Sequence, residues 1–172
     1  LTWLVPLSLI GTICGWLYFV SEHTSEALAH AIGERPVVKA MLAGLALAIC
    51  GTVLPYTMFA GETQADVLME TYLTIPAGVL IATGLVKAML TPALINLGWR
   101  GGHFFPVIFS GVSLGYGLAI LTGADPVFCV AVCTASTMGA VMRQPVMVVG
   151  LLLMCFPLKG IVCMIIAAVI AA

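Results

Sequence analysis

Charge is scarce in this sequence. Asp, Glu, Lys and Arg make up only 8% of its 172 residues, whereas a soluble globular domain has about 25% charged residues. The formal net charge is −1, so the chain has neither the basic field that nucleic acids require nor an acidic tail. We therefore expect no nucleic-acid partner, and we expect the lipid bilayer, other helices and small solutes instead.

Common cofactor-binding patterns are also missing. Each of the six cysteines lies in an apolar segment and none forms a C-x-x-C pair, which is typical of cysteines that serve as small buried hydrophobic residues. Cys129 and Cys133 are four residues apart and would share a helical face, but we favour burial over a metal site. There is no strand-like alternation, and the glycines lack the flanking strand of a nucleotide loop. We expect no cofactor.

Long apolar segments are abundant instead. Hydrophobic residues make up 62% of the chain, and residues 1–20 carry no charge. A helix of this length can cross about 30 Å of hydrocarbon. We expect this helix to leave the lipid near Ser21 and to run on towards Ala31. A polar turn follows and ends at Pro36, which suits the first turn of a second, antiparallel helix that reaches about Pro55.

The remaining apolar segments are interrupted by proline and glycine. They begin at Ile75, Phe104, Pro126, Pro145 and Gly160. The third and fourth, residues 126–142 and 145–157, are short for full membrane spans. Segments of this kind indicate helices that enter a membrane without crossing it cleanly and line a buried cavity. The predicted fold class is all-α: a multi-pass integral membrane protein of tilted and broken helices.

Two charged features interrupt this pattern. Glu62, Asp66 and Glu70 recur every four residues, and we favour a solvated helical face outside the bilayer over a cation site. Lys87 lies in the middle of an apolar segment and must face protein or water. It is either an electrostatic attractor along a pore, or a side chain that snorkels or pairs with a carboxylate or a backbone carbonyl.

The most informative run pairs two glycines with the start of the charge-free residues 104–124. A helix that begins inside a membrane presents unpaired backbone N–H groups and the positive end of its dipole, which together make an anion site. Glycines permit a tight turn and a close approach, and a proline in the first turn has no N–H to lose. The candidate anion-binding residues are Gly102, His103, Phe104, Phe105 and Pro106.

These five residues resemble the G-x-F-x-P anion filter of the CLC family of chloride channels and transporters. Downstream, Gly111 to Gly115 resembles the glycine-spaced helix of the family, and Met138 to Pro145 resembles its M-G/A-A…R-x-P segment. The resemblance implies transport of chloride or another anion, with the amides of His103 and Phe104 on the central ion. Because that motif uses the backbone, we expect the His103 side chain to point away and to hydrogen-bond a neighbour, rather than to act as a pH-sensitive group.

The resemblance also implies how the protein is organised. Residues 1–172 would form the C-terminal half of the family's inverted repeat, truncated at both ends. The coordinating serine and the gating glutamate would belong to the N-terminal half of the same subunit. A homodimer in the cell membrane is implied, with residues 145–156 and 158–172 at its interface.

We therefore predict an anion channel or a proton-coupled antiporter, and not an enzyme. Two alternatives stay open. One is an intramembrane enzyme that uses His103 with Ser110, which are seven residues apart and could share a helical face. The other is a structural membrane half with no transport activity of its own.

Overall fold

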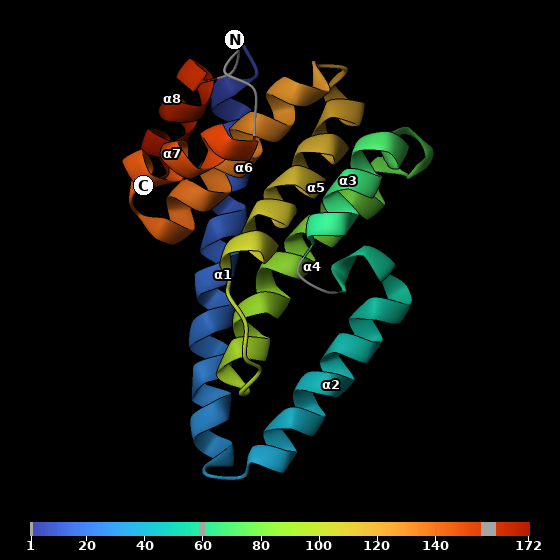
Figure 1. The fold of residues 1–172 in the computed structure, drawn as a ribbon, viewed down its shortest axis with the longest axis vertical. Helices are drawn as coiled ribbons and strands as arrows, with labels where there is room; N and C mark the ends of the chain where they lie inside the picture. The colour runs from blue at the N-terminus through green and yellow to red at the C-terminus, as the bar shows by residue number, and fades with distance from the viewer. Residues whose placement is uncertain (1, 59–60, 156–160) are drawn as a thin grey trace.

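The computed structural model describes residues 2–58, 61–155 and 161–172, and these form helices and connecting turns without a strand (Figure 1). The helices are α1 (Leu4–Ile32), α2 (Pro36–Val53), η1 (Pro55–Thr57), α3 (Glu62–Thr71), η2 (Tyr72–Thr74), α4 (Ala77–Asn96), α5 (Phe104–Thr122), α6 (Pro126–Met142), α7 (Pro145–Cys155) and α8 (Ile161–Ala171). By length and composition, α1, α2, α4 and α5 can each cross a membrane, whereas α6, α7 and α8 are shorter. The all-α class with broken helices is confirmed.

Proline, glycine and one aspartate set the helix boundaries that the sequence predicts. Pro36 and Pro126 each stand in the first turn of their helix. The Asp125 side chain caps α6 by accepting a hydrogen bond of 3.0 Å from the backbone N–H of Phe128. Gly123 ends α5 in the left-handed conformation, with φ 65°, which favours glycine.

Helix α5 forms the centre of the structure, between α4 and α6, and every residue from Val107 to Ala119 is buried. Small residues allow this packing, as the glycine spacing predicts. A Cβ atom added at Gly111 would lie 2.5 Å from the Cα of Thr134, and one at Gly115 would lie 2.5 Å from the Cα of Val130. The backbones of α5 and α6 are therefore in direct contact.

Polar side chains bridge the same helices. Ser113 Oγ of α5 donates to the carbonyl of Leu80 in α4 at 2.8 Å, and Thr137 Oγ1 of α6 donates to the carbonyl of Gly11 in α1 at 3.2 Å. In lipid, hydrogen bonds and close van der Waals contact hold helices together, because the surrounding acyl chains are as apolar as the helix surfaces. The first bond connects α5 to α4, and the second connects α6 to α1.

Helix α2 departs from the prediction. It returns antiparallel to α1 but diverges from it, so that the two helices form a wedge in Figure 1. Only 6% of the apolar window of α2 is buried, against 44% for α1. The antiparallel direction is confirmed, but close packing is not. A helix with apolar residues on all its faces gains little free energy by packing on another helix, because lipid is equally apolar.

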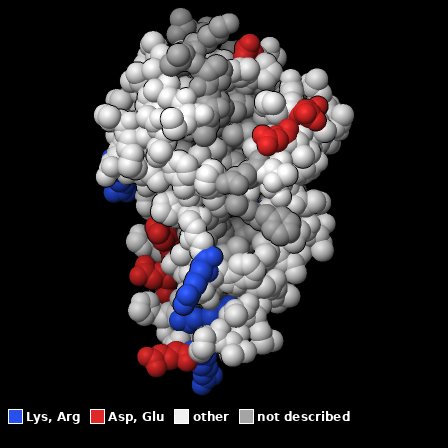
Figure 2. Space-filling view, viewed as in Figure 1, with Lys and Arg blue, Asp and Glu red and all other residues white. Residues whose placement is uncertain are grey.

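Lys and Arg side chains gather at one end of the molecule, whereas Asp and Glu lie at both ends (Figure 2). In Figure 2 most of the visible Lys and Arg side chains lie towards the end of the molecule where α1 turns into α2. Helix α1 has 29 residues, about 43 Å at 1.5 Å per residue, which exceeds a hydrocarbon layer of about 30 Å. This length fits the prediction that α1 leaves the lipid near Ser21.

Two buried threonines of α6 provide a test of this packing. Thr137 Oγ1 has its partner on α1, whereas Thr134 Oγ1 is buried and has no hydrogen-bond partner among the described residues. We expect Thr137→Val to lower the free energy of unfolding by about 1 kcal/mol. Thr134→Val should leave it unchanged or raise it, because an unpartnered buried hydroxyl is removed. Reversible unfolding in mixed micelles measures both, and equal losses would contradict this packing.

Candidate anion site at the start of α5

The backbone at the start of α5 has several unpaired donors. His103 is the residue before the helix, and its carbonyl accepts the first helical hydrogen bond, from the N–H of Val107 at 3.1 Å. No backbone amide from Gly101 to Phe105 donates a hydrogen bond to another described residue. The first helical amides, those of Phe104 and Phe105, point out of the helix start with the positive end of the α5 dipole, so this segment can hold a small anion without a full positive charge.

The glycines before α5 do not all act as predicted. Neither Gly101 nor Gly102 has a positive φ, and the sharp turn falls instead at Gly98, with φ 97°. That turn follows directly on the end of α4 and was not identified from the sequence. A Cβ at Gly101 or Gly102 would meet no atom within 4 Å. Because these two glycines have no side chain, the space beside their amides is open and a ligand can approach there.

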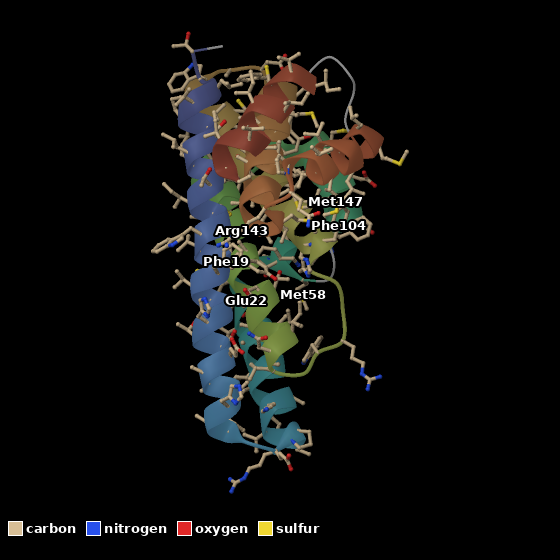
Figure 3. The ribbon with its side chains drawn as sticks, turned by 90° about the vertical axis from the view of Figure 1, so that its left-hand side faces the viewer. Phe19, Glu22, Met58, Phe104, Arg143 and Met147 are labelled. Atoms are coloured by element: carbon tan, nitrogen blue, oxygen red, sulfur yellow. The ribbon has the colours of Figure 1, made fainter. Side chains whose placement is uncertain are left out.

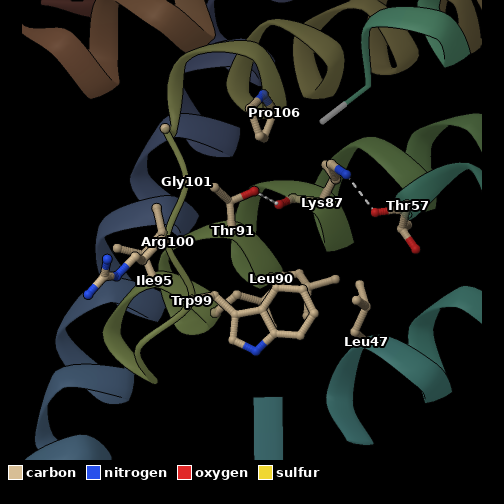
Figure 4. Close-up of a pocket in the computed structure, with 12 residues that line it drawn as sticks. Leu47, Thr57, Lys87, Leu90, Thr91, Ile95, Trp99, Arg100, Gly101 and Pro106 are labelled. Atoms are coloured by element: carbon tan, nitrogen blue, oxygen red, sulfur yellow. Dashed lines mark hydrogen bonds between the residues drawn. The ribbon is translucent and has the colours of Figure 1, made fainter. Parts of the chain in front are cut away.

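A cavity of about 280 Å³ lies beside this segment (Figure 4). Its walls come from α2, η1, α4, the α4–α5 turn and the start of α5. They include Leu47, Thr57, Lys87, Thr91, Trp99, Arg100, Gly101, Gly102 and Pro106. The cavity therefore brings together Gly102 and Pro106 of the predicted site with the membrane-depth lysine, residues that are far apart in the sequence.

Lys87 is 4% exposed, so it faces protein, as its position in an apolar segment predicts. Its Nζ donates a hydrogen bond of 2.6 Å to the carbonyl of Thr57 and lies 5.8 Å from the centre of the Phe109 ring. Thr91 Oγ1 donates to the carbonyl of Lys87 itself at 2.8 Å, and Figure 4 shows both hydrogen bonds. Of the alternatives from the sequence, pairing with a backbone carbonyl is confirmed, while attraction of an anion stays a prediction.

The His103 side chain makes a different contact from the one expected. Its ring is exposed and meets Tyr18 of α1 edge-on, with ring centres 6.4 Å apart. Among the described residues it has no hydrogen bond, so the predicted hydrogen bond is wrong. Ser110, its partner in the enzyme alternative, is fully buried and donates to the carbonyl of Pro106 at 2.8 Å. Both Ser110 and Pro106 belong to α5, so this hydroxyl is bonded within its own helix.

Arg143 lies near the start of α5 (Figure 3). Arg143 ends α6 with φ 51°, and its guanidinium carbon lies 5.0 Å from the centre of the Phe19 ring on α1. Figure 3 shows Arg143, Phe19 and Phe104 near the point where α5 begins. The sequence showed Arg143 as part of a motif, but its contact with Phe19 could not be predicted, because it depends on how α1 and α6 cross.

The charges on α3 do not form a metal site in the part of the chain that is described. Asp66 and Glu70 are exposed, as expected of a solvated face, and the Glu62 side chain lies outside the described residues. No group of three His, Cys, Asp or Glu side chains with metal-binding geometry occurs among the described residues. The cation-site alternative therefore gains no support.

These observations define a multi-pass helical membrane protein with an unpaired helix start beside a cation-lined cavity. The family model for voltage gated chloride channels matches residues 1–172, and the chain belongs to that family. No curated protein and no solved structure matches the chain. Members of the family are chloride or anion channels or transporters, not enzymes. The enzyme alternative is therefore wrong, and the expectation of anion transport through a membrane is confirmed.

Proposed function

We propose that this chain contributes one side of a chloride filter, with backbone amides as the ion's ligands. The donors are the N–H groups from Gly102 to Phe105, with those of His103 and Phe104 proposed to coordinate the central ion, and Pro106 stands in the first turn without a donor. The single observation that carries the proposal is that these amides have no described partner. An array of neutral donors holds an anion weakly enough for it to leave again.

The exposure of this segment supports a filter that is completed from elsewhere. Gly102 and His103 are exposed and Phe105 is 46% exposed, although the helix that they begin is buried from Val107 to Ala119. We propose that the N-terminal half of the same subunit covers this face and provides the remaining ligands, so that residues 1–172 act as the C-terminal half of an inverted repeat. On this proposal, residues 1–172 on their own would be a structural half with weak ion binding.

Helices α7 and α8 are the proposed homodimer interface. They expose large apolar side chains, including Val146 at 87%, Met154 at 88% and Val162 at 64%. Residues 156–160, with Lys159, belong to the predicted interface but lie outside the described residues. The membrane is proposed to be the cell membrane. A channel and a proton-coupled antiporter are both compatible with a backbone filter, and reversal potentials across a pH gradient distinguish them.

The filter proposal predicts a specific effect of removing one amide. Phe104→Pro deletes the N–H of residue 104, and because His103 has helical angles (φ −84°, ψ −12°) that a following proline disfavours, it also disturbs the backbone of the turn. We expect chloride flux, or the preference for chloride over nitrate, to fall about tenfold, since a hydrogen bond to a charged group contributes roughly 1.5–3 kcal/mol. Flux from proteoliposomes containing the whole protein measures the effect.

Phe104→Ala is the matched control, because it removes the ring and keeps the amide. It should retain the anion preference of the parent protein. Unaltered flux and selectivity in Phe104→Pro would show that this amide does not contact the ion, and an equal loss in both variants would assign the effect to the ring.

Lys87 is proposed to attract anions into the cavity while its own hydrogen bonds hold it in place. At an effective dielectric constant of about 20, a unit charge roughly 10 Å away contributes about 1.7 kcal/mol, and burial limits its screening by salt. We expect Lys87→Met to reduce chloride flux at low chloride concentration by about tenfold. Lys87→Arg should retain most of the flux because the charge remains.

Arg100→Met serves as the comparison, because Arg100 lines the same cavity but is exposed. Its effect should be small and should vanish as salt is added, whereas that of Lys87→Met should persist. Fluxes measured at two ionic strengths test this difference, and identical behaviour of the two variants would rule out a special role for the buried charge.

A further inference from the structure

A second cavity lies apart from the filter, between α1, α2 and the end of α4. Its volume is about 190 Å³, and it is lined by Glu26, Ala29, His30, Lys39 and Asn96. Four of these five side chains are polar, in a chain with only 8% charged residues. The anion pathway proposed above uses none of them, so the cavity needs an explanation of its own.

The floor of this cavity is fixed by a hydrogen-bond network. Asn96 Nδ2 donates to the carbonyl of Glu22 at 3.0 Å and to Ser25 Oγ at 2.9 Å. The end of α4 is thereby bound to α1, and the amide oxygen of Asn96 is left as an acceptor. Lys39 reaches the cavity from the first turn of α2, where it is the only charged residue of that helix.

Opposite charges line the cavity without neutralising one another. Glu26, His30 and Lys39 form no ion pair with any described residue. A ligand that carries both charges can satisfy all three, with an anionic group on Lys39 and His30 and a cationic donor on the Glu26 carboxylate. A cavity of this volume holds about six water molecules or a polar group of similar size.

The depth of the cavity matches that of phospholipid headgroups. Residues Leu4 to Ser21 of α1 carry no charge and span about 27 Å, close to the hydrocarbon thickness of about 30 Å. Glu26 lies about 7 Å further along the axis, within the polar layer. The same turns of α1 and α2 carry exposed apolar side chains, with Leu28 48%, Val38 41% and Leu42 38% exposed, and acyl chains can lie against them.

We propose that this cavity binds the phosphoethanolamine headgroup of a membrane phospholipid. Lys39 and His30 donate to the phosphate, and Glu26 and the Asn96 amide oxygen accept from the ammonium group. Because α2 is splayed from α1 and barely packed, the bound lipid fills the base of the wedge between them and connects the two helices. Basic pockets between membrane helices at this depth are suited to lipid phosphates.

Native mass spectrometry of the whole protein, with phosphatidylethanolamine, phosphatidylcholine or phosphatidylglycerol added, tests the proposal. The parent protein should retain phosphatidylethanolamine in preference to the other two lipids. Lys39→Gln should lower its retention about fivefold. Glu26→Gln should abolish the preference for phosphatidylethanolamine over phosphatidylglycerol while retaining phosphatidylglycerol, which also shows that the variant is folded.

Arg35→Gln is the control. Arg35 directly precedes α2 and is four residues from Lys39, but it does not line the cavity. It should bind lipid as the parent does. Equal retention of phosphatidylethanolamine by the parent and Lys39→Gln, or equal retention of phosphatidylcholine and phosphatidylethanolamine by the parent, would overturn the proposal. Displacement of the lipid by micromolar free phosphoethanolamine would overturn it in favour of a soluble ligand. None of these outcomes depends on chloride flux.

Discussion

The constraint on which this structure depends is that backbone polar groups at membrane depth must find partners. Most of the chain meets it through helical hydrogen bonds, side-chain caps and serine or threonine donors. The amides from Gly101 to Phe105 have no partner among the described residues, and they lie at the start of α5, a helix buried from Val107 to Ala119. We propose that an anion is their partner, and membership of the voltage gated chloride channel family agrees with this proposal.

The surrounding packing keeps that exception in one place. Gly111 and Gly115 bring α5 into backbone contact with α6, and Ser113 bonds it to α4. The start of α5 therefore cannot move away from α4, which positions Lys87 along the same cavity. By donating to the Thr57 carbonyl, the Lys87 amino group gains a partner in a region where an isolated ammonium group would be too costly to bury. Lys87 therefore shares the cavity with Gly101, Gly102 and Pro106 of the segment that leads into α5.

Features set by local chemistry could be predicted from the sequence. The helix starts at Pro36 and Pro126, the cap at Asp125 and the close approach at Gly111 all follow from the residue type and its neighbours. The anion-binding run could be proposed because it combines glycines, a proline and a charge-free helix. The identity of the ion as chloride followed from the resemblance of this run to the filter motif of a known family.

Features that depend on how helices cross could not be predicted. The wedge between α1 and α2 is one case, because apolar periodicity does not specify a partner when lipid is the solvent. The contact of His103 with Tyr18, the Thr57 partner of Lys87 and the turn at Gly98 are others. Each joins residues whose distance is set by the whole bundle rather than by the local sequence.

Anomalous scattering from bromide, used in place of chloride, locates the ion most directly. A crystal of the whole protein soaked in bromide should show an anomalous peak within about 3.5 Å of the backbone nitrogens of His103 and Phe104, since bromide accepts hydrogen bonds from the same donors. Bromide peaks elsewhere in the membrane region, with none at these two amides, would contradict the central claim that the start of α5 binds the transported anion.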